Sequence, residues 1–240
     1  MLYILVRSTN TKIIGHAAPQ VTDDGPFADY GPFLRKLPEG DLYIPPLFKL
    51  NGKAKLVDWL SSVRCNAPLH VLISDFFADC LGSFKAPPYR CFPTTVVTRN
   101  AKEYDYVIMM HAAWDGAIDF ERSEYVRMKA NYIPGNPYPE YDDLGKVNIS
   151  SFEELDYLVH NQESGVSIYN TALFLKEDVP YDFYIKPGHP WAWIVNEKVR
   201  EGLLAAKIKG LFFIPFQQGM NMKETDLYEL AITLEGTISK

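Results

Sequence analysis

The 240-residue sequence lacks the short motifs that mark the common enzyme classes. It contains no GxxxxGK[ST] phosphate-binding loop, no GxGxxG, no HExxH and no GxSxG nucleophile elbow. The three cysteines (Cys65, Cys80 and Cys91) lie in apolar surroundings without CxxC spacing, which predicts buried, reduced thiols rather than a metal site or a disulfide framework. The sequence therefore shows no catalytic signature, and we expect neither a metal nor a cofactor.

Long apolar runs and excess positive charge are also missing. No stretch approaches the roughly 20 apolar residues that a membrane-spanning helix needs. The apolar run in MLYILVRSTN is too short for a signal-peptide core and is interrupted by Arg7, so it predicts a first strand. The chain has 24 Lys and Arg against 30 Asp and Glu, so the general attraction to nucleic-acid phosphate is absent. Together these features predict a cytoplasmic protein that binds neither membrane nor nucleic acid directly.

What the chain does contain is one pattern that occurs twice. Residues 68–93 align without a gap on residues 190–215, at a constant offset of 122 residues. Each segment has an apolar run, a small polar residue of the type that caps helices (Ser74 or Asn196), an acidic residue, an amphipathic stretch and a second apolar run with proline. This order predicts strand, helix and strand in each segment, as in a duplicated unit that keeps its core and changes its surface.

The fold prediction follows from this pattern. We expect an α+β protein in which two related strand-helix-strand repeat units pack into one body, with mixed or antiparallel sheets and short helices. The repeats span residues 42–97 and 168–217, the connecting segment spans residues 98–167, and residues 1–240 form a single domain.

Four further elements are predicted outside the aligned segments. Asn51 caps a helix with Leu56, Trp59, Leu60 and Val63 on one face; residues 104–110 form a strand; Ser151 and Glu154 form a capping box; and residues 228–235 form a final strand.

Two groups of acidic and aromatic residues are the candidates for a partner-binding surface. One lies in a stretch rich in tyrosine and proline (residues 132–141) and the acidic residues after it, which offers a large amphipathic contact area. The alternative is a proline-stiffened connector whose tyrosines pack on the parent sheet. The candidate residues are Asp115, Asp119 and Glu121 in one group, and Tyr138, Glu140, Tyr141, Asp142 and Asp143 in the other.

An enzyme remains the alternative class. Its site would lie in a cleft between the two repeats, with His111, His160 and His189 as candidate bases. A Ser-His-Asp triad stays open, because triads are recognised by geometry rather than by order in the sequence. His111 and Asp115 have the i, i+4 spacing of one helical face, but a metal site needs three or four converging ligands.

The duplicated pattern resembles a family of bacterial immunity proteins from polymorphic-toxin and type VI secretion systems. The likeness covers roughly residues 42–218 and is closest in WIVNEKVREGLLAAKIKGLFFIPF (193–216), where Asn196 replaces the family's usual serine. The stretch GKVNISSFEELDYL (145–158) is similar to the family's strand-helix insert. The resemblance implies a non-enzymatic inhibitor, monomeric or a small homo-oligomer, that binds a cognate toxin or effector encoded nearby. An adaptor or chaperone that loads effectors would show the same pattern.

Overall fold

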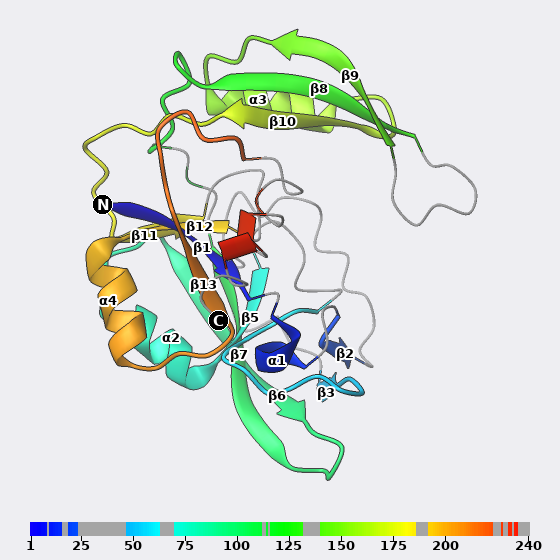
Figure 1. Cartoon of the computed structure of the whole chain (residues 1–240), viewed down its shortest axis with the longest axis vertical. Helices are drawn as coiled ribbons and strands as arrows, with labels where there is room; N and C mark the ends of the chain where they lie inside the picture. The colour runs from blue at the N-terminus through cyan, green and yellow to red at the C-terminus, as the bar shows by residue number, and fades with distance from the viewer. Residues whose placement is uncertain are drawn as a thin grey trace. The chain divides into compact units, whose positions relative to one another are not determined.

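A computed structural model of the chain describes residues 1–8, 10–15, 19–23, 47–62, 70–111, 114, 116–131, 140–185, 192–222, 227, 230–231 and 233–234. It contains strands in mixed and antiparallel sheets together with short helices, so the α+β class is confirmed (Figure 1). The chain divides into two compact units. Unit 1 comprises Met1–Trp114, Pro180–Phe216 and Ala231–Lys240, and unit 2 comprises Asp115–Val179 and Gln217–Leu230.

The described part of unit 1 contains two sheets, the helices α1 (Thr11–Ile14), α2 (Asp75–Leu81) and α4 (Glu197–Ala205), and a few helical residues near the end of the chain. The six-stranded sheet consists, in spatial order, of β2 (Val21–Asp23), β3 (Phe48–Leu50), β6 (Tyr89–Val97), β7 (Glu103–His111), β5 (His70–Ser74) and β4 (Trp59–Leu60). Only the pair β3 and β6 is parallel in this sheet. The four-stranded antiparallel sheet consists of β11 (Phe183–Ile185), β12 (Ala192–Asn196), β1 (Leu2–Arg7) and β13 (Leu211–Pro215).

The two aligned segments have the predicted order of elements, β5-α2-β6 and β12-α4-β13. The capping residues also act as predicted, because each side-chain oxygen accepts a hydrogen bond from an amide in the first helical turn. Ser74 Oγ accepts from the Phe77 amide at 3.1 Å, and Asn196 Oδ1 accepts from the Val199 amide at 3.1 Å.

The two segments also pair with their neighbours in the same way. Strand β7 lies between β5 and β6, and β1 takes the same place between β12 and β13. The registers correspond pair by pair: Trp59↔Ile73, Ile73↔Val107 and Pro93↔Val107 in one sheet, and Phe183↔Val195, Val195↔Tyr3 and Pro215↔Tyr3 in the other. The middle strand comes after the first segment along the chain but before the second.

An aspartate in front of each segment links that segment to the other one. Asp58 accepts hydrogen bonds from Ser74 Oγ at 2.6 Å and from the Lys209 amide at 2.6 Å. Asp182 accepts from Asn196 Nδ2 at 2.8 Å and from the Lys85 amide at 2.9 Å. Each carboxylate therefore holds the capping residue of its own helix and the backbone that follows the other helix.

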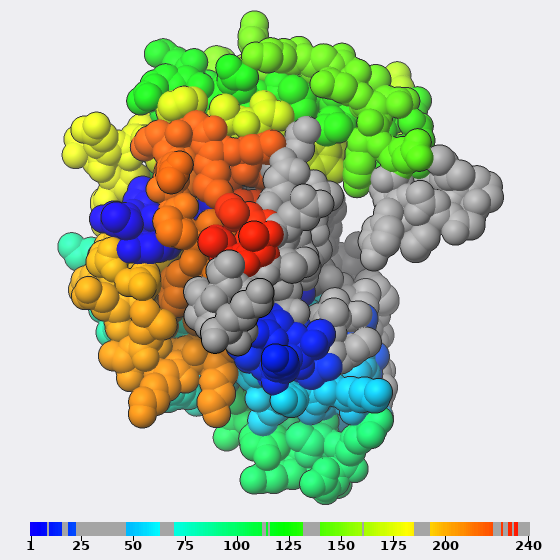
Figure 2. Space-filling view, in the orientation of Figure 1, coloured from blue at the N-terminus to red at the C-terminus, as the bar shows by residue number. Residues whose placement is uncertain are grey.

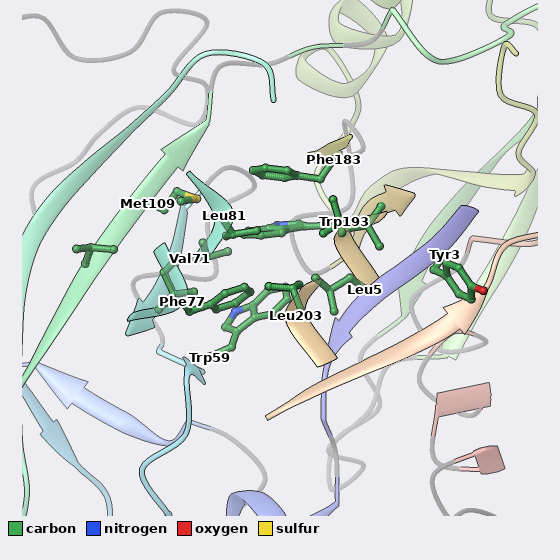
Figure 3. Packing of buried hydrophobic residues seen from close by; sticks show 14 residues of the cluster. Tyr3, Leu5, Trp59, Val71, Phe77, Leu81, Met109, Phe183, Trp193 and Leu203 are labelled. Carbon is green, nitrogen blue, oxygen red and sulfur yellow. The ribbon is translucent and has the colours of Figure 1, made fainter. Parts of the chain in front are cut away.

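A shared hydrophobic core joins the two segments within unit 1 (Figure 3). The fully buried indole of Trp193 lies at its centre, with ring centroids 5.0 Å from Trp59, 5.6 Å from Phe183 and 6.1 Å from Phe77. Such aromatic contacts add to the burial of apolar area, which contributes about 25 cal/mol per Å². The described side chains of the two segments thus pack together in one core.

Three sequence-based predictions about local structure and burial are wrong. The helix expected after Asn51 does not form: Asn51 and Gly52 lie at a turn, and Trp59 and Leu60 form β4; Val63 is outside the described residues. The segment expected as a final strand is helical where it is described, at Leu230, Ala231, Thr233 and Leu234. Cys91 is exposed rather than buried and Cys80 is half-buried, whereas Cys65 is not among the described residues.

Unit 2 contains a three-stranded antiparallel sheet and one helix. The sheet consists, in spatial order, of β10 (Val166–Ala172), β8 (Glu124–Asn131) and β9 (Glu140–Val147). Helix α3 (Phe152–His160) covers one face, where Leu155 packs with Tyr125 and Ile149. Ser151 Oγ accepts from the Glu154 amide at 3.2 Å as predicted, but the Glu154 carboxylate accepts from the Ser150 amide rather than from that of Ser151. No helix in the described part of the chain is long and apolar enough to cross a membrane.

Candidate partner-binding surface

The six candidate residues that the structure describes all belong to unit 2. Asp119 and Glu121 precede β8, whereas Glu140, Tyr141, Asp142 and Asp143 form the first half of β9. Asp115 and Tyr138 lie outside the described residues. The sequence was interpreted as a loop up to Tyr141, but Glu140 already begins a strand.

The structure separates the two candidate groups. In the antiparallel pairing of β8 with β9, Glu140 lies opposite Asn131 at the end of β8, whereas Glu121 comes before Glu124 at its beginning. A strand rises about 3.3 Å per residue, so Glu140 lies about 23 Å along β8 from Glu124, and Asp143, opposite Met128, lies about 13 Å from it. The two groups therefore begin at opposite ends of β8, and β9 and the segment before β8 are considered as separate surfaces.

The group on β9 is solvent-exposed and acidic. All residues of β9 except the last are exposed, and Tyr141 retains 42% of its side-chain exposure (Figure 2). Tyr141 also makes an edge contact with the ring of Tyr169 at 5.9 Å, so it packs partly on its own sheet. Asp142 accepts a hydrogen bond from Asn131 Nδ2 at 2.6 Å, and Asp143 accepts from the Gly145 amide at 2.8 Å. These carboxylates are oriented yet remain open to solvent.

The group before β8 has a more local role. Asp119 is half-buried, accepts from the Arg122 amide at 3.3 Å and forms an ion pair with the Arg122 guanidinium at 3.9 Å. Glu121 lines a shallow hollow of about 550 Å³ that also contains Arg122, Lys146 and Glu154. Three acidic and two basic side chains line this hollow, so neither sign of charge clearly dominates it. Asp119 stabilises a turn, and Glu121 belongs to a mixed-charge surface.

The histidine at the end of β7 is part of the core. His111 is the last residue of strand β7, so it does not lie on the helical face that its spacing from Asp115 would allow; Asp115 is outside the described residues. The His111 residue is 1% exposed, neither ring nitrogen has a hydrogen-bond partner among the described residues, and the ring of Trp193 lies 5.3 Å away. Burial, with a smaller contribution from His70, lowers the pKa of His111 to about 3, and burial lowers the pKa of His70 to about 4.

The other elements of the enzyme alternative gain no support from the described residues. The side chain of His160 and all of His189 are outside the described part of the chain. Within that part, no group of three His, Cys, Asp or Glu side chains could hold a metal ion. His111 has no charged or hydrogen-bonding partner there that would prepare it for proton transfer.

Two residues of β9 were not identified from the sequence, Leu144 and Lys146. Leu144 is 46% exposed, and Lys146 forms an ion pair with Glu124 at 2.9 Å. The sequence EYDDLGKV gives little strand signal, because aspartate and glycine favour turns. Only the pairing with β8 shows that these residues line a sheet edge.

No protein-family model matches the chain, and no curated protein sequence is significantly similar to it.

Proposed function

We propose that this protein is a non-enzymatic, antitoxin-like immunity protein that binds a cognate bacterial toxin or effector and covers its active or essential surface. The observation that supports this proposal is the exposed strand β9, with its acidic residues and Tyr141. Tyrosine is enriched in protein interfaces, and their rims are polar. The resemblance of the two strand-helix-strand segments to immunity proteins supports the same function.

We further propose that β5-α2-β6 and β12-α4-β13 are copies of one repeat unit. The identical pairing registers support this, as do Asp58 and Asp182, which stand at equivalent places before the two segments. Each copy would comprise four strands, with β4 and β7 completing the first and β11 and β1 completing the second. In this proposal the copies form a scaffold, and the segment inserted between them carries the partner-binding strand β9.

A growth assay with purification tests the function. The neighbouring reading frame is expressed in a bacterial host with and without this protein, and the complex is isolated by affinity tag. We expect growth to be rescued and a stable complex to be recovered. The double variant Glu140→Lys with Tyr141→Ala should weaken the complex by about tenfold or more, since central contacts in interfaces are worth about 1–2 kcal/mol or more.

Glu121→Lys is the matched control, because it makes the same charge reversal about one strand length away. It should leave the complex and the rescue unchanged. Toxicity without rescue would overturn the proposed function. Rescue that depends on Glu121 but not on Glu140 and Tyr141 would place the partner at the hollow before β8 instead.

A further inference from the structure

Strand β9 is a free edge of its sheet. In the described part of the chain it pairs with β8 only, so alternate backbone amides and carbonyls of β9 point away from the sheet. The opposite edge, β10, is mostly half-buried, whereas β9 is exposed over almost its whole length. Among the described residues the two edges of this small sheet therefore differ in exposure, and β9 is the more accessible of the two to another strand.

Soluble proteins usually protect such an edge with lysine, proline or a bulge. β9 contains no proline, and its single lysine, Lys146, is paired with Glu124. The pairing shifts register opposite Leu144 and Gly145, where Gly145 has a φ of +98°. Residues Glu140–Asp143 precede this irregularity and pair with consecutive residues of β8. This half of the edge has the regular geometry that an added strand needs.

The negative charge of Glu140–Asp143 indicates which kind of partner segment this half of β9 would bind. Three of its four residues are carboxylates, and no described residue forms an ion pair with Glu140. Side chains alternate between the faces of a strand, so Glu140 and Asp142 lie on one face of the sheet while Asp143 lies on the other with Tyr141. An added strand would meet negative charge on both faces, which favours a segment rich in lysine or arginine.

We propose that β9 binds an extended basic segment of a partner protein by strand addition, so that the partner becomes the fourth strand of the sheet after β9. Backbone hydrogen bonds to the free edge hold the segment, and its basic side chains meet Glu140, Asp142 and Asp143. The inference rests on the proposed function, since it states how the partner is recognised.

The test uses the full-length protein and a labelled seven-residue probe peptide that alternates lysine with valine. Two matched probes accompany it: the same sequence with N-methyl groups on alternate amides, which keeps every charge but blocks one hydrogen-bonding edge, and a sequence with glutamate in place of lysine. Fluorescence anisotropy measures binding, and hydrogen–deuterium exchange reports protection of Glu140–Val147.

We expect only the unmodified basic peptide to bind, with slower exchange in β9. Raising the ionic strength from about 0.05 to 0.5 M should weaken binding several-fold, since the screening length falls from about 14 to 4 Å. Glu140→Lys should weaken it by about fivefold, whereas Glu201→Lys on α4, also exposed, should not.

Equal binding of the N-methylated peptide, unchanged exchange in β9, or no binding of the basic peptide at millimolar concentration would overturn strand addition. None of these results would affect growth rescue by the full-length protein. A complex with the neighbouring gene product that forms while the peptide test fails therefore refutes the binding mode alone, and the absence of that complex refutes the proposed function.

Discussion

At the end of β7, the imidazole of His111 lies against the rings of Tyr89 and Trp193, in a place that suits an apolar aromatic ring. A neutral imidazole still carries one N–H, and here that donor is buried without a partner. Leaving a buried donor unpaired costs about 1–3 kcal/mol. The ring of His111 therefore stabilises the core by its packing, whereas its unpaired N–H lowers the stability of the folded state.

The titration of His111 should make the protein sensitive to acid. The unfolded histidine binds a proton below about pH 6.5, but the folded one does so only near pH 3, so acidification favours the unfolded state. Between these values the free energy of unfolding should fall by about 1.4 kcal/mol per pH unit from this residue. Urea unfolding at several pH values, for the wild type and for His111→Phe, measures the effect.

The difference in stability between His111→Phe and the wild type should widen as the pH falls from 7 to 5. His70 lies on the neighbouring strand, and its pKa of about 4 adds a similar dependence that both proteins share. Parallel pH profiles for the two proteins would show that His111 is not held neutral by the core.

At the scale of elements, hydrogen bonds link the start of each helix in the two aligned segments to the backbone that follows the helix of the other segment. Asp182 shows the electrostatic consequence. Desolvation alone would raise the pKa of Asp182, but hydrogen bonds from the Lys85 amide and Asn196, together with the Lys198 ammonium, outweigh it and lower the pKa. The carboxylate is thus ionised and oriented at neutral pH.

Removing either aspartate should destabilise unit 1. Asp58→Ala or Asp182→Ala leaves a capping side chain and a backbone amide without their acceptor, and hydrogen bonds to a charged group contribute about 1.5–3 kcal/mol. We expect each variant to lose about 2–3 kcal/mol in urea unfolding. Asp79→Ala, at an exposed position of α2, is the control and should change stability by less than about 0.5 kcal/mol. Losses as small as that of the control would show that these hydrogen bonds do not link the segments.

The sequence predicted those elements whose signal is local. The N-caps at Ser74, Asn196 and Ser151 depend on one side chain and the next three amides, so their residue types were sufficient. The two-residue strand β4 was mistaken for part of a helix because Trp59 faces one hydrophobic core and Leu60 faces another. A strand buried on both faces shows no alternation, and adjacent apolar residues then fit a helix equally well.

The sequence indicated some residues of the candidate surface but not their position at a sheet edge. Glu140 to Asp143 were selected by composition, and the sequence could not show that they form a sheet edge, because that depends on pairing with β8. The sequence likewise could not show that Asp119 and Glu121 come before β8, whereas Glu140 to Asp143 lie on the strand that pairs with it.

At the scale of the whole molecule, one strand at the start of the chain completes a sheet formed near its end. β1 pairs on one side with β12 and on the other with β13, and Ile4 and Leu5 are fully buried. Without β1, the edges of β12 and β13 that now pair with it would lose their hydrogen-bonding partner. The N-terminal residues are therefore part of the core of unit 1.

Deleting residues 1–8 should abolish the cooperative unfolding of unit 1, and adding the peptide MLYILVRS should restore it. The same peptide with Leu5→Asp is the control, since it places an uncompensated charge at a fully buried position. Thermal unfolding followed by near-UV circular dichroism, which reports the packing of Trp193, measures both. A truncated chain that unfolds as cooperatively as the intact one would show that β1 is dispensable.

The position of β1 also bears on how the protein is made. A ribosome synthesises β1 about 190 residues before its partners β12 and β13, which at about 5–20 residues per second is a delay of roughly 10–40 s. During that interval Tyr3, Ile4 and Leu5 form an apolar segment with no sheet to join. The nascent chain therefore has to keep β1 available, and away from other chains, until β12 and β13 have been translated.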